Sequence, residues 1–167
     1  MRRPLDGWES VQRRGADGSV DSDERVRSER PVVERSERGA RTLGDLYWLE
    51  VARASGGAVR RRNTAAGVEI RLFGFGPSLL RFGPPEIGVE AGGVFCRFPI
   101  RGGLLARAPR GSITLSQSGE EQPQLRAAIS GFVPRVALKP LYDQLQRRFH
   151  VRISRRYFWR LIREAPR

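Results

Sequence analysis

The sequence has few of the residues that build metal centres, disulfides and catalytic sites. Its 167 residues include one cysteine, Cys96, and one histidine, His150. A single cysteine cannot form a disulfide within one chain, and one Cys with one His cannot supply the ligands of a usual zinc site. We therefore expect no metal and no cofactor, and we interpret Cys96 as a buried free thiol in a reducing cytoplasm.

Long apolar runs are also missing. No stretch approaches the roughly 18 consecutive apolar residues that a membrane-spanning helix needs, so the sequence predicts no transmembrane segment. The opening residues include the pair Arg2 and Arg3 but no apolar segment follows them, which predicts no export signal. We expect a cytoplasmic protein.

Lysine is nearly absent, yet the chain is strongly basic. Lys139 is the only lysine among 31 basic residues, which outnumber 18 acidic residues and give a net charge of +13. A GC-rich coding sequence also favours arginine, so this bias has a compositional explanation beside a functional one. A charge of this size attracts nucleic acid, anionic lipid or acidic proteins whatever its origin.

Residues 1–42 mix arginine with Asp, Glu, Ser and Gly and contain few apolar residues. Such a composition buries too little apolar surface to offset the entropy of ordering the chain, so it predicts a disordered mixed-charge arm. Its positive and negative charges nearly cancel. The basic character therefore belongs to residues 43–167.

Residues 43–135 consist of short runs bounded by glycine and proline, which is typical of an antiparallel sheet built from hairpins. Alternation and β-branched or aromatic residues predict strands at 47–51, 67–73, 93–98 and 112–115. Weaker patterns predict further strands at 58–62, 78–82, 104–107 and 125–133. The result is a curved, mostly antiparallel sheet of about seven strands, with closure into a partial barrel left open.

Residues 136–167 change to a helical period. Pro140 suits a first helical turn and Ser154 suits an N-cap, so we expect two amphipathic helices, over 140–149 and 154–164, joined by residues 150–153. These helices would pack on the sheet within one domain. The predicted fold class is α+β, a sheet covered by two C-terminal helices and preceded by a disordered arm.

The last helix carries the sharpest chemical pattern. At about 100° per residue, four arginines and an indole fall on one arc and four apolar residues on the other. The polar arc holds Arg155, Arg156, Trp159, Arg160 and Arg163, and the apolar arc holds Tyr157, Phe158, Leu161 and Ile162. The polar arc is our candidate polyanion site, for nucleic acid before an anionic membrane surface, including a helix-turn-helix arrangement. The plainer interpretation is a solvated arginine face.

Catalytic patterns are weak. His150 ends a predicted helix, where a surface role is the simpler interpretation, and Glu50 is expected to neutralise a neighbouring arginine. In an extended strand Arg60 and Arg62 share one face while Arg61 takes the other. We expect no enzyme, with neither catalytic nor cofactor-binding residues.

Three functions remain open from the sequence. The first is a non-enzymatic binding protein whose basic helix engages polyanions. The second is a carrier of a small apolar ligand inside a cupped sheet. Its inward wall residues would include Trp48, Val68, Ile70, Phe73, Phe95 and Phe98. The third is a module that docks on a protein or an anionic membrane.

Overall fold

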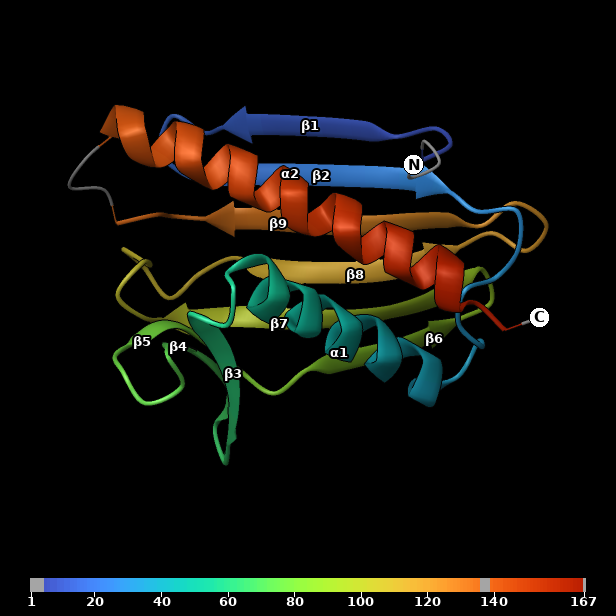
Figure 1. Ribbon diagram of the computed structural model, residues 1–167, viewed down its shortest axis with the longest axis horizontal. Coiled ribbons are helices and arrows are strands. Elements are labelled where there is room, and N and C mark those ends of the chain that lie inside the picture. The colour runs from blue at the N-terminus through green and yellow to red at the C-terminus, as the bar shows by residue number, and fades with distance from the viewer. Residues whose placement is uncertain (1–4, 136–138, 167) are drawn as a thin grey trace.

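Nine strands and two helices make up the described part of the chain in the computed structural model (Figure 1). The structure describes residues 5–135 and 139–166, with the side chains of the last helix described from residue 148 onward. The elements are β1 (Glu9–Arg14), β2 (Val20–Arg27), α1 (Glu37–Ala54), β3 (Val59–Thr64), β4 (Gly67–Leu72), β5 (Ser78–Phe82), β6 (Glu86–Glu90), β7 (Gly93–Gly102), β8 (Ser112–Ser118), β9 (Gln124–Phe132) and α2 (Lys139–Glu164).

The strands form one open sheet in the order β1-β2-β9-β8-β7-β5-β4-β3, and β6 pairs with β7 beside this path. Every pairing between these strands is antiparallel. Because β1 and β3 lie at opposite edges, the sheet does not close. The α+β class and the mostly antiparallel sheet are therefore confirmed, with nine strands in place of about seven.

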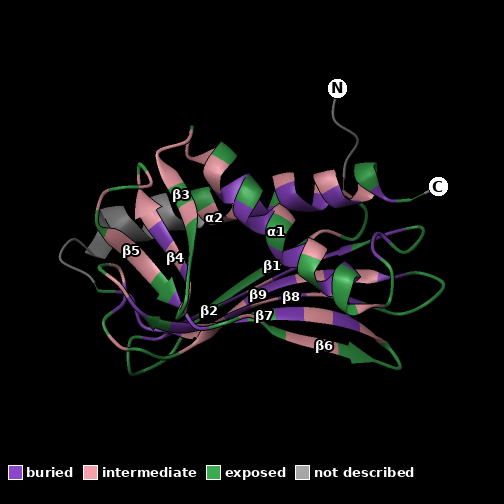
Figure 2. Ribbon diagram, turned by 90° about the horizontal axis from the view of Figure 1, so that it is seen from below, coloured by how far each residue is buried: buried purple, intermediate pink, exposed green. Residues whose placement is uncertain are grey.

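Both helices lie on the same face of the sheet, and β3, β4 and β5 rise toward them at one end (Figure 2). Inward and outward residues alternate along the strands, so Ile113 and Leu115 of β8 are buried beneath the helices. Helix α1 approaches β7 closely at Gly44, where a Cβ atom would lie 2.8 Å from Cζ of Phe98. The hydrophobic core lies between this sheet face and the helices.

The prediction of a disordered arm over residues 1–42 is wrong, because β1 and β2 form a hairpin and α1 begins at Glu37. Strand β2 pairs with β9 and faces the core with Val20, Ser22, Glu24 and Val26, all buried. Two of these four inward residues are polar, so an apolar alternation was not visible in the sequence. Strand β1 is exposed along its whole length and pairs with β2 alone.

The strand predicted at 47–51 is also wrong, because these residues belong to helix α1. Leu43, Tyr47, Trp48 and Val51 are buried at helical spacing, a pattern that a five-residue window cannot separate from a strand. The helix begins after Ser36, whose Oγ accepts a hydrogen bond from the Gly39 amide at 3.1 Å. The second helix on the sheet therefore comes from this N-terminal region.

The two C-terminal helices predicted over 140–149 and 154–164 are one continuous helix, α2. No link interrupts it at residues 150–153, and Ser154 is a buried residue inside the helix rather than its N-cap. The Ser154 hydroxyl binds a carboxylate on β2, a partner that local sequence does not reveal. The predicted boundary at residue 136 lies outside the described residues.

The remaining strand predictions are largely confirmed. Strands β3, β4, β5, β7, β8 and β9 lie where the sequence indicated them. Strand β6 was missed, and the strand predicted at 104–107 is reduced to one isolated bridge between Ala106 and Pro134. Both segments are short and lie next to glycine or proline, so they contain too few residues for an alternation of apolar and polar residues to be recognised.

Gln117 is expected to be essential for stability. Its Oε1 accepts hydrogen bonds from the amides of Val32 and Val33, and its Nε2 donates to the Val33 carbonyl, all inside the protein. Replacing Gln117 by leucine leaves these backbone groups unpaired, which should lower the free energy of unfolding by about 2–4 kcal/mol in urea. The exposed Gln122→Leu is the control; equal urea midpoints for Gln117→Leu and wild type would contradict this assignment.

Candidate functional site

The second half of α2 has the two faces that the sequence predicted. Tyr157, Phe158 and Leu161 are buried, whereas the arginines lie on the partly or fully exposed side. The apolar face contacts the core, so it is not available to enter a membrane.

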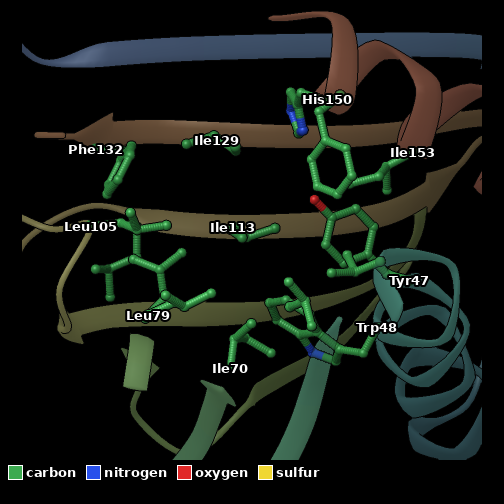
Figure 3. A pocket seen from close by; sticks show the side chains of 15 residues that line it. Tyr47, Trp48, Ile70, Leu79, Leu105, Ile113, Ile129, Phe132, His150 and Ile153 are labelled. Atoms are coloured by element: carbon green, nitrogen blue, oxygen red, sulfur yellow. The ribbon is translucent and has the colours of Figure 1, made fainter. Parts of the chain in front are cut away.

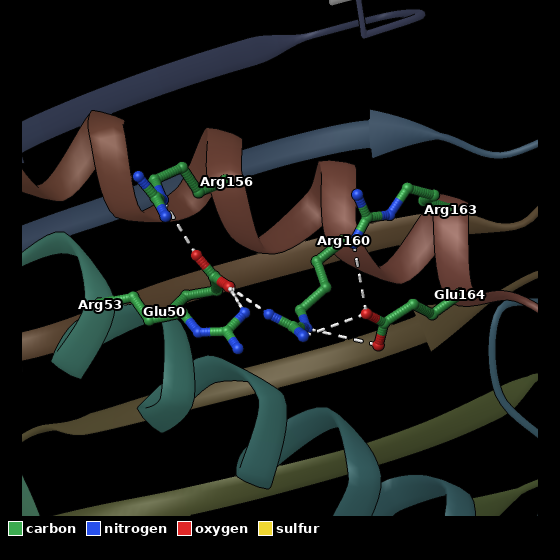
Figure 4. A network of polar contacts seen from close by, with 6 residues as sticks. All are labelled: Glu50, Arg53, Arg156, Arg160, Arg163 and Glu164. Carbon is green, nitrogen blue, oxygen red and sulfur yellow. Dashed lines mark hydrogen bonds and ion pairs between the residues drawn. The ribbon is translucent and has the colours of Figure 1, made fainter.

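The predicted arginines do not all face solvent, because a buried carboxylate on α1 takes two of them (Figure 4). Arg156 Nε lies 3.0 Å from Oε2 of Glu50, and Arg160 Nη1 lies 2.7 Å from Oε1. Arg53 of α1 adds a third guanidinium, with Nη1 3.5 Å from Glu50 Oε1. The expectation that Glu50 neutralises an arginine is confirmed, although Glu50 lies on a helix rather than a strand. This network joins α2 to α1.

The remaining predicted site residues lie around this network. The guanidinium of Arg163 stacks on the Trp159 ring with its Cζ 5.6 Å from the ring centroid, and Arg155 lies 5.9 Å from the Trp8 ring. Glu164 pairs with Arg160 at 3.1 Å and with Arg163 at 3.6 Å. A groove of about 360 Å³ between α1 and α2 is lined by Glu50, Arg53, Arg156, Trp159, Arg160 and Arg163. The sequence missed Arg53, which only the pairing of the helices brings here.

A second feature is a largely apolar cavity of about 180 Å³ between the sheet and the helices (Figure 3). Its walls come from both helices, from β3, β4, β5, β7, β8 and β9, and from the segment after β7. The lining residues are Tyr47, Trp48, Val51, Val59, Ile70, Leu79, Leu80, Ile100, Leu105, Ile113, Ile129, Phe132, Phe149, His150 and Ile153. Strands β3, β4 and β5 rise from the sheet plane toward the helices (Figure 2), and each contributes at least one lining residue.

Of the wall residues predicted for a carrier, Trp48 and Ile70 line this cavity. Val68 and Phe98 are buried elsewhere in the core, and Phe73 is 53% exposed. Phe95 is only partly buried and lies under the guanidinium of Arg97. Eight of the fifteen lining residues are leucine or isoleucine, and they come from five strands, the segment after β7 and helix α2, which no spacing in the sequence connects.

Polar groups gather at one end of the cavity. The hydroxyl of Tyr47 points into it near His150 (Figure 3), and this hydroxyl has no hydrogen-bond partner within the described ranges. The Trp48 Nε1 donor is buried and likewise unpaired among the described residues. An apolar cavity with a few polar groups at one end is typical of small-molecule sites.

Behind this end lies a buried carboxylate. Glu24 of β2 accepts hydrogen bonds from Ser22 Oγ and Ser154 Oγ, each at 2.9 Å, and Nε2 of His150 lies 3.3 Å from Glu24 Oε2. Burial lowers the pKa of His150, against the opposing effect of Glu24, and burial raises the pKa of Tyr47. The surface role expected for His150 is therefore wrong: its imidazole is largely buried inside the protein, in the middle of α2.

The structure gives little support for thiol chemistry or metal binding. Burial raises the pKa of the Cys96 thiol to about 12, which makes the thiolate scarce near neutral pH. Among the side chains that the structure describes, those of residues 5–135 and 148–166, no group of three or more His, Cys, Asp or Glu could hold a metal ion.

Comparisons with models of known protein families, with curated proteins and with solved structures found no match for this chain. Neither of the two helices described is long and apolar enough to cross a membrane. The site must therefore be judged from its own geometry.

His150 should make the protein less stable in mild acid. Because burial lowers its pKa below the ordinary value of 6.5, the unfolded chain binds a proton at a higher pH than the folded chain. The free energy of unfolding should therefore fall as the pH drops below 6.5. As His150 is the only histidine, His150→Gln should remove most of this slope between about pH 6.5 and 5. Urea titrations at each pH measure the free energy of unfolding. An unchanged pH slope in His150→Gln would refute the conclusion that His150 causes the loss of stability in acid.

Proposed function

We propose that this protein is a non-enzymatic binding protein that holds a small, mostly apolar ligand in the cavity between its sheet and helices. The observation that carries the proposal is the 180 Å³ cavity with apolar walls and unpaired polar groups at Tyr47 and Trp48. An empty apolar volume of this size lowers stability, since its lining atoms lose contacts that a filled core would make. A bound ligand would restore those contacts.

The size of the cavity sets the size of the ligand. An apolar cavity of roughly 150 Å³ is enough to hold benzene, so this one fits a molecule of about one aromatic ring or a short aliphatic chain. The hydroxyl of Tyr47 and the imidazole of His150 favour a ligand with one polar group at its end. The free, buried thiol of Cys96 supports our continued proposal of a cytoplasmic location.

Benzene is a suitable first probe. We expect saturating benzene to raise the melting temperature, because a ligand that binds only the folded state stabilises it. Ile113→Phe fills the cavity and should abolish this shift while leaving the unliganded protein about as stable. The control Ile87→Phe places the same change on β6, away from the cavity, and should keep the shift. No response of the wild type, or an undiminished response of Ile113→Phe, would reject the proposal.

The polar end can be tested with phenol. Phenol should bind up to about tenfold more tightly than benzene, since its hydroxyl can pair with Tyr47 or His150. Tyr47→Phe should reduce that difference without weakening benzene. Titration calorimetry of wild type and Tyr47→Phe with benzene and with phenol measures these four affinities.

Polyanion binding along α2 remains a second candidate function. The observation that favours it is an excess of charge: the guanidiniums of Arg53, Arg156 and Arg160 converge on the single carboxylate of Glu50. Arg155 and Arg163 add exposed positive charge on either side. This arrangement supports contact with phosphates, with nucleic acid as the proposed partner.

This candidate is best tested away from Glu50, because removing Arg156 or Arg160 would take a close cationic partner from a buried carboxylate and destabilise the fold as well. Arg155→Gln with Arg163→Gln should weaken binding to a duplex DNA oligonucleotide and reduce its salt dependence by about two phosphate contacts. The control is Arg30→Gln with Arg38→Gln, the same charge change on exposed residues elsewhere. Equal affinities of the two double variants would argue against α2 as the contact surface.

A further inference from the structure

The turn between β4 and β5 presents two phenylalanines to solvent. Phe75 is 83% exposed and Phe73 is 53% exposed, and their rings stack with centroids 6.4 Å apart. Phe73 has φ +53°, the one non-glycine residue with positive φ in the described ranges. Such a backbone conformation is unfavourable for a bulky side chain, so holding Phe73 in it lowers the stability of the fold. We call Phe73 and Phe75 together the phenylalanine tip.

Another exposed apolar residue lies at the same end of the molecule. The amide of Leu104 donates to the Ser78 carbonyl at 3.0 Å, which places Leu104 beside the start of β5. Its side chain is 52% exposed. The turn and this segment both lie at the end where α2 begins, on the left in Figure 1. Together they form an apolar projection that the described part of the fold does not cover.

Arginines of the neighbouring strands share the sheet face that points away from the helices. In the register, Arg60 pairs with Arg71, and Glu69 lies between Arg62 and Arg81. Val68 and Ile70 alternate with them and are buried on the other face. Arg61 lies on that inner side and pairs with Asp45 at 2.6 Å, which confirms the predicted parity of residues 60–62.

This basic sheet face consists of Arg60, Arg62, Arg71, Arg81 and the exposed Arg101 of β7. Its one acidic member, Glu69, pairs with Arg71 at 3.1 Å. None of the other four arginines has a carboxylate partner within the described ranges. The face therefore keeps a strong positive excess next to the phenylalanine tip.

The geometry points to a docking surface for an anionic lipid bilayer. The phenylalanine tip and Leu104 would enter the boundary between headgroups and acyl chains, and the arginines would contact lipid phosphates and carboxylates. A bilayer fits better than single-stranded nucleic acid, since base binding relies on aromatic faces, whereas a bilayer accepts aromatic and aliphatic side chains alike. Leu104 offers no aromatic face at all. This inference does not require the cavity to be occupied.

Sedimentation with vesicles tests the surface on the full chain. Wild type should bind vesicles of phosphatidylcholine and phosphatidylserine in a roughly 7:3 mixture, bind pure phosphatidylcholine far less, and dissociate as salt rises. Phe73→Gly with Phe75→Ser should weaken binding at least tenfold. Glycine suits the positive φ of residue 73, so this variant should melt no lower than wild type. Arg60→Gln with Arg62→Gln should weaken binding by a similar factor.

Matched controls make the result specific. Val89→Ser removes an exposed apolar residue from β6, and Arg30→Gln with Arg38→Gln removes two charges elsewhere; both should bind vesicles as wild type does. The proposal is overturned if wild type does not bind the anionic vesicles, or if the controls lose as much as the variants. It is equally overturned if a single-stranded oligonucleotide binds more tightly than vesicles and depends on the same residues. Benzene binding should be unchanged in every variant, which separates this surface from the cavity.

Discussion

The buried carboxylate of Glu50 is the contact on which the arrangement of the two helices depends. Glu50 is almost fully buried, and such a group requires compensation by positive charge. Arg156 and Arg160 of α2 supply it, so their binding positions α2 against α1. Since Tyr47, Trp48 and Val51 of α1 face the sheet, the same contact fixes one wall of the cavity. Arginines that look like a binding surface in the sequence therefore serve first to hold the fold together.

A second buried carboxylate joins α2 to the N-terminal hairpin. Glu24 of β2 is held by Ser22 and Ser154, with the imidazole of His150 3.3 Å away. His150 also lines the cavity, so a polar network inside the protein meets the space available to a ligand. Polar atoms buried in this way need fixed partners, which makes this end of the cavity more ordered than an apolar contact alone would. A ligand with one polar end matches that asymmetry.

Positive charge is neutralised to different degrees on different surfaces of the molecule. Along α2 it is partly neutralised by Glu50 and Glu164, and on β2 and β9 the carboxylate of Asp23 pairs with both Arg25 and Arg126. The outer face of β3, β4 and β5 has Glu69 as its only acidic side chain and stands beside the exposed phenylalanines. A net charge of +13 thus describes the chain but does not locate the surface that acts on a partner.

The sequence by itself determined β3, β4, β5, β7, β8 and β9, and also the helical second half of α2 with its buried apolar face, because these depend on periodicity within a short segment. It did not determine β1, β2, α1 or β6: β1 is exposed along its whole length, β2 and α1 bury polar residues such as Glu24 and Glu50, and β6 is only 5 residues long. Only the tertiary structure decided that Glu50 neutralises Arg156 and Arg160, that His150 lies next to Glu24, and that residues from both helices and six strands line one cavity. The pairs Glu50–Arg156 and Glu50–Arg160 are 106 and 110 residues apart in the sequence, and the spacing of residues within a short segment does not predict such long-range contacts.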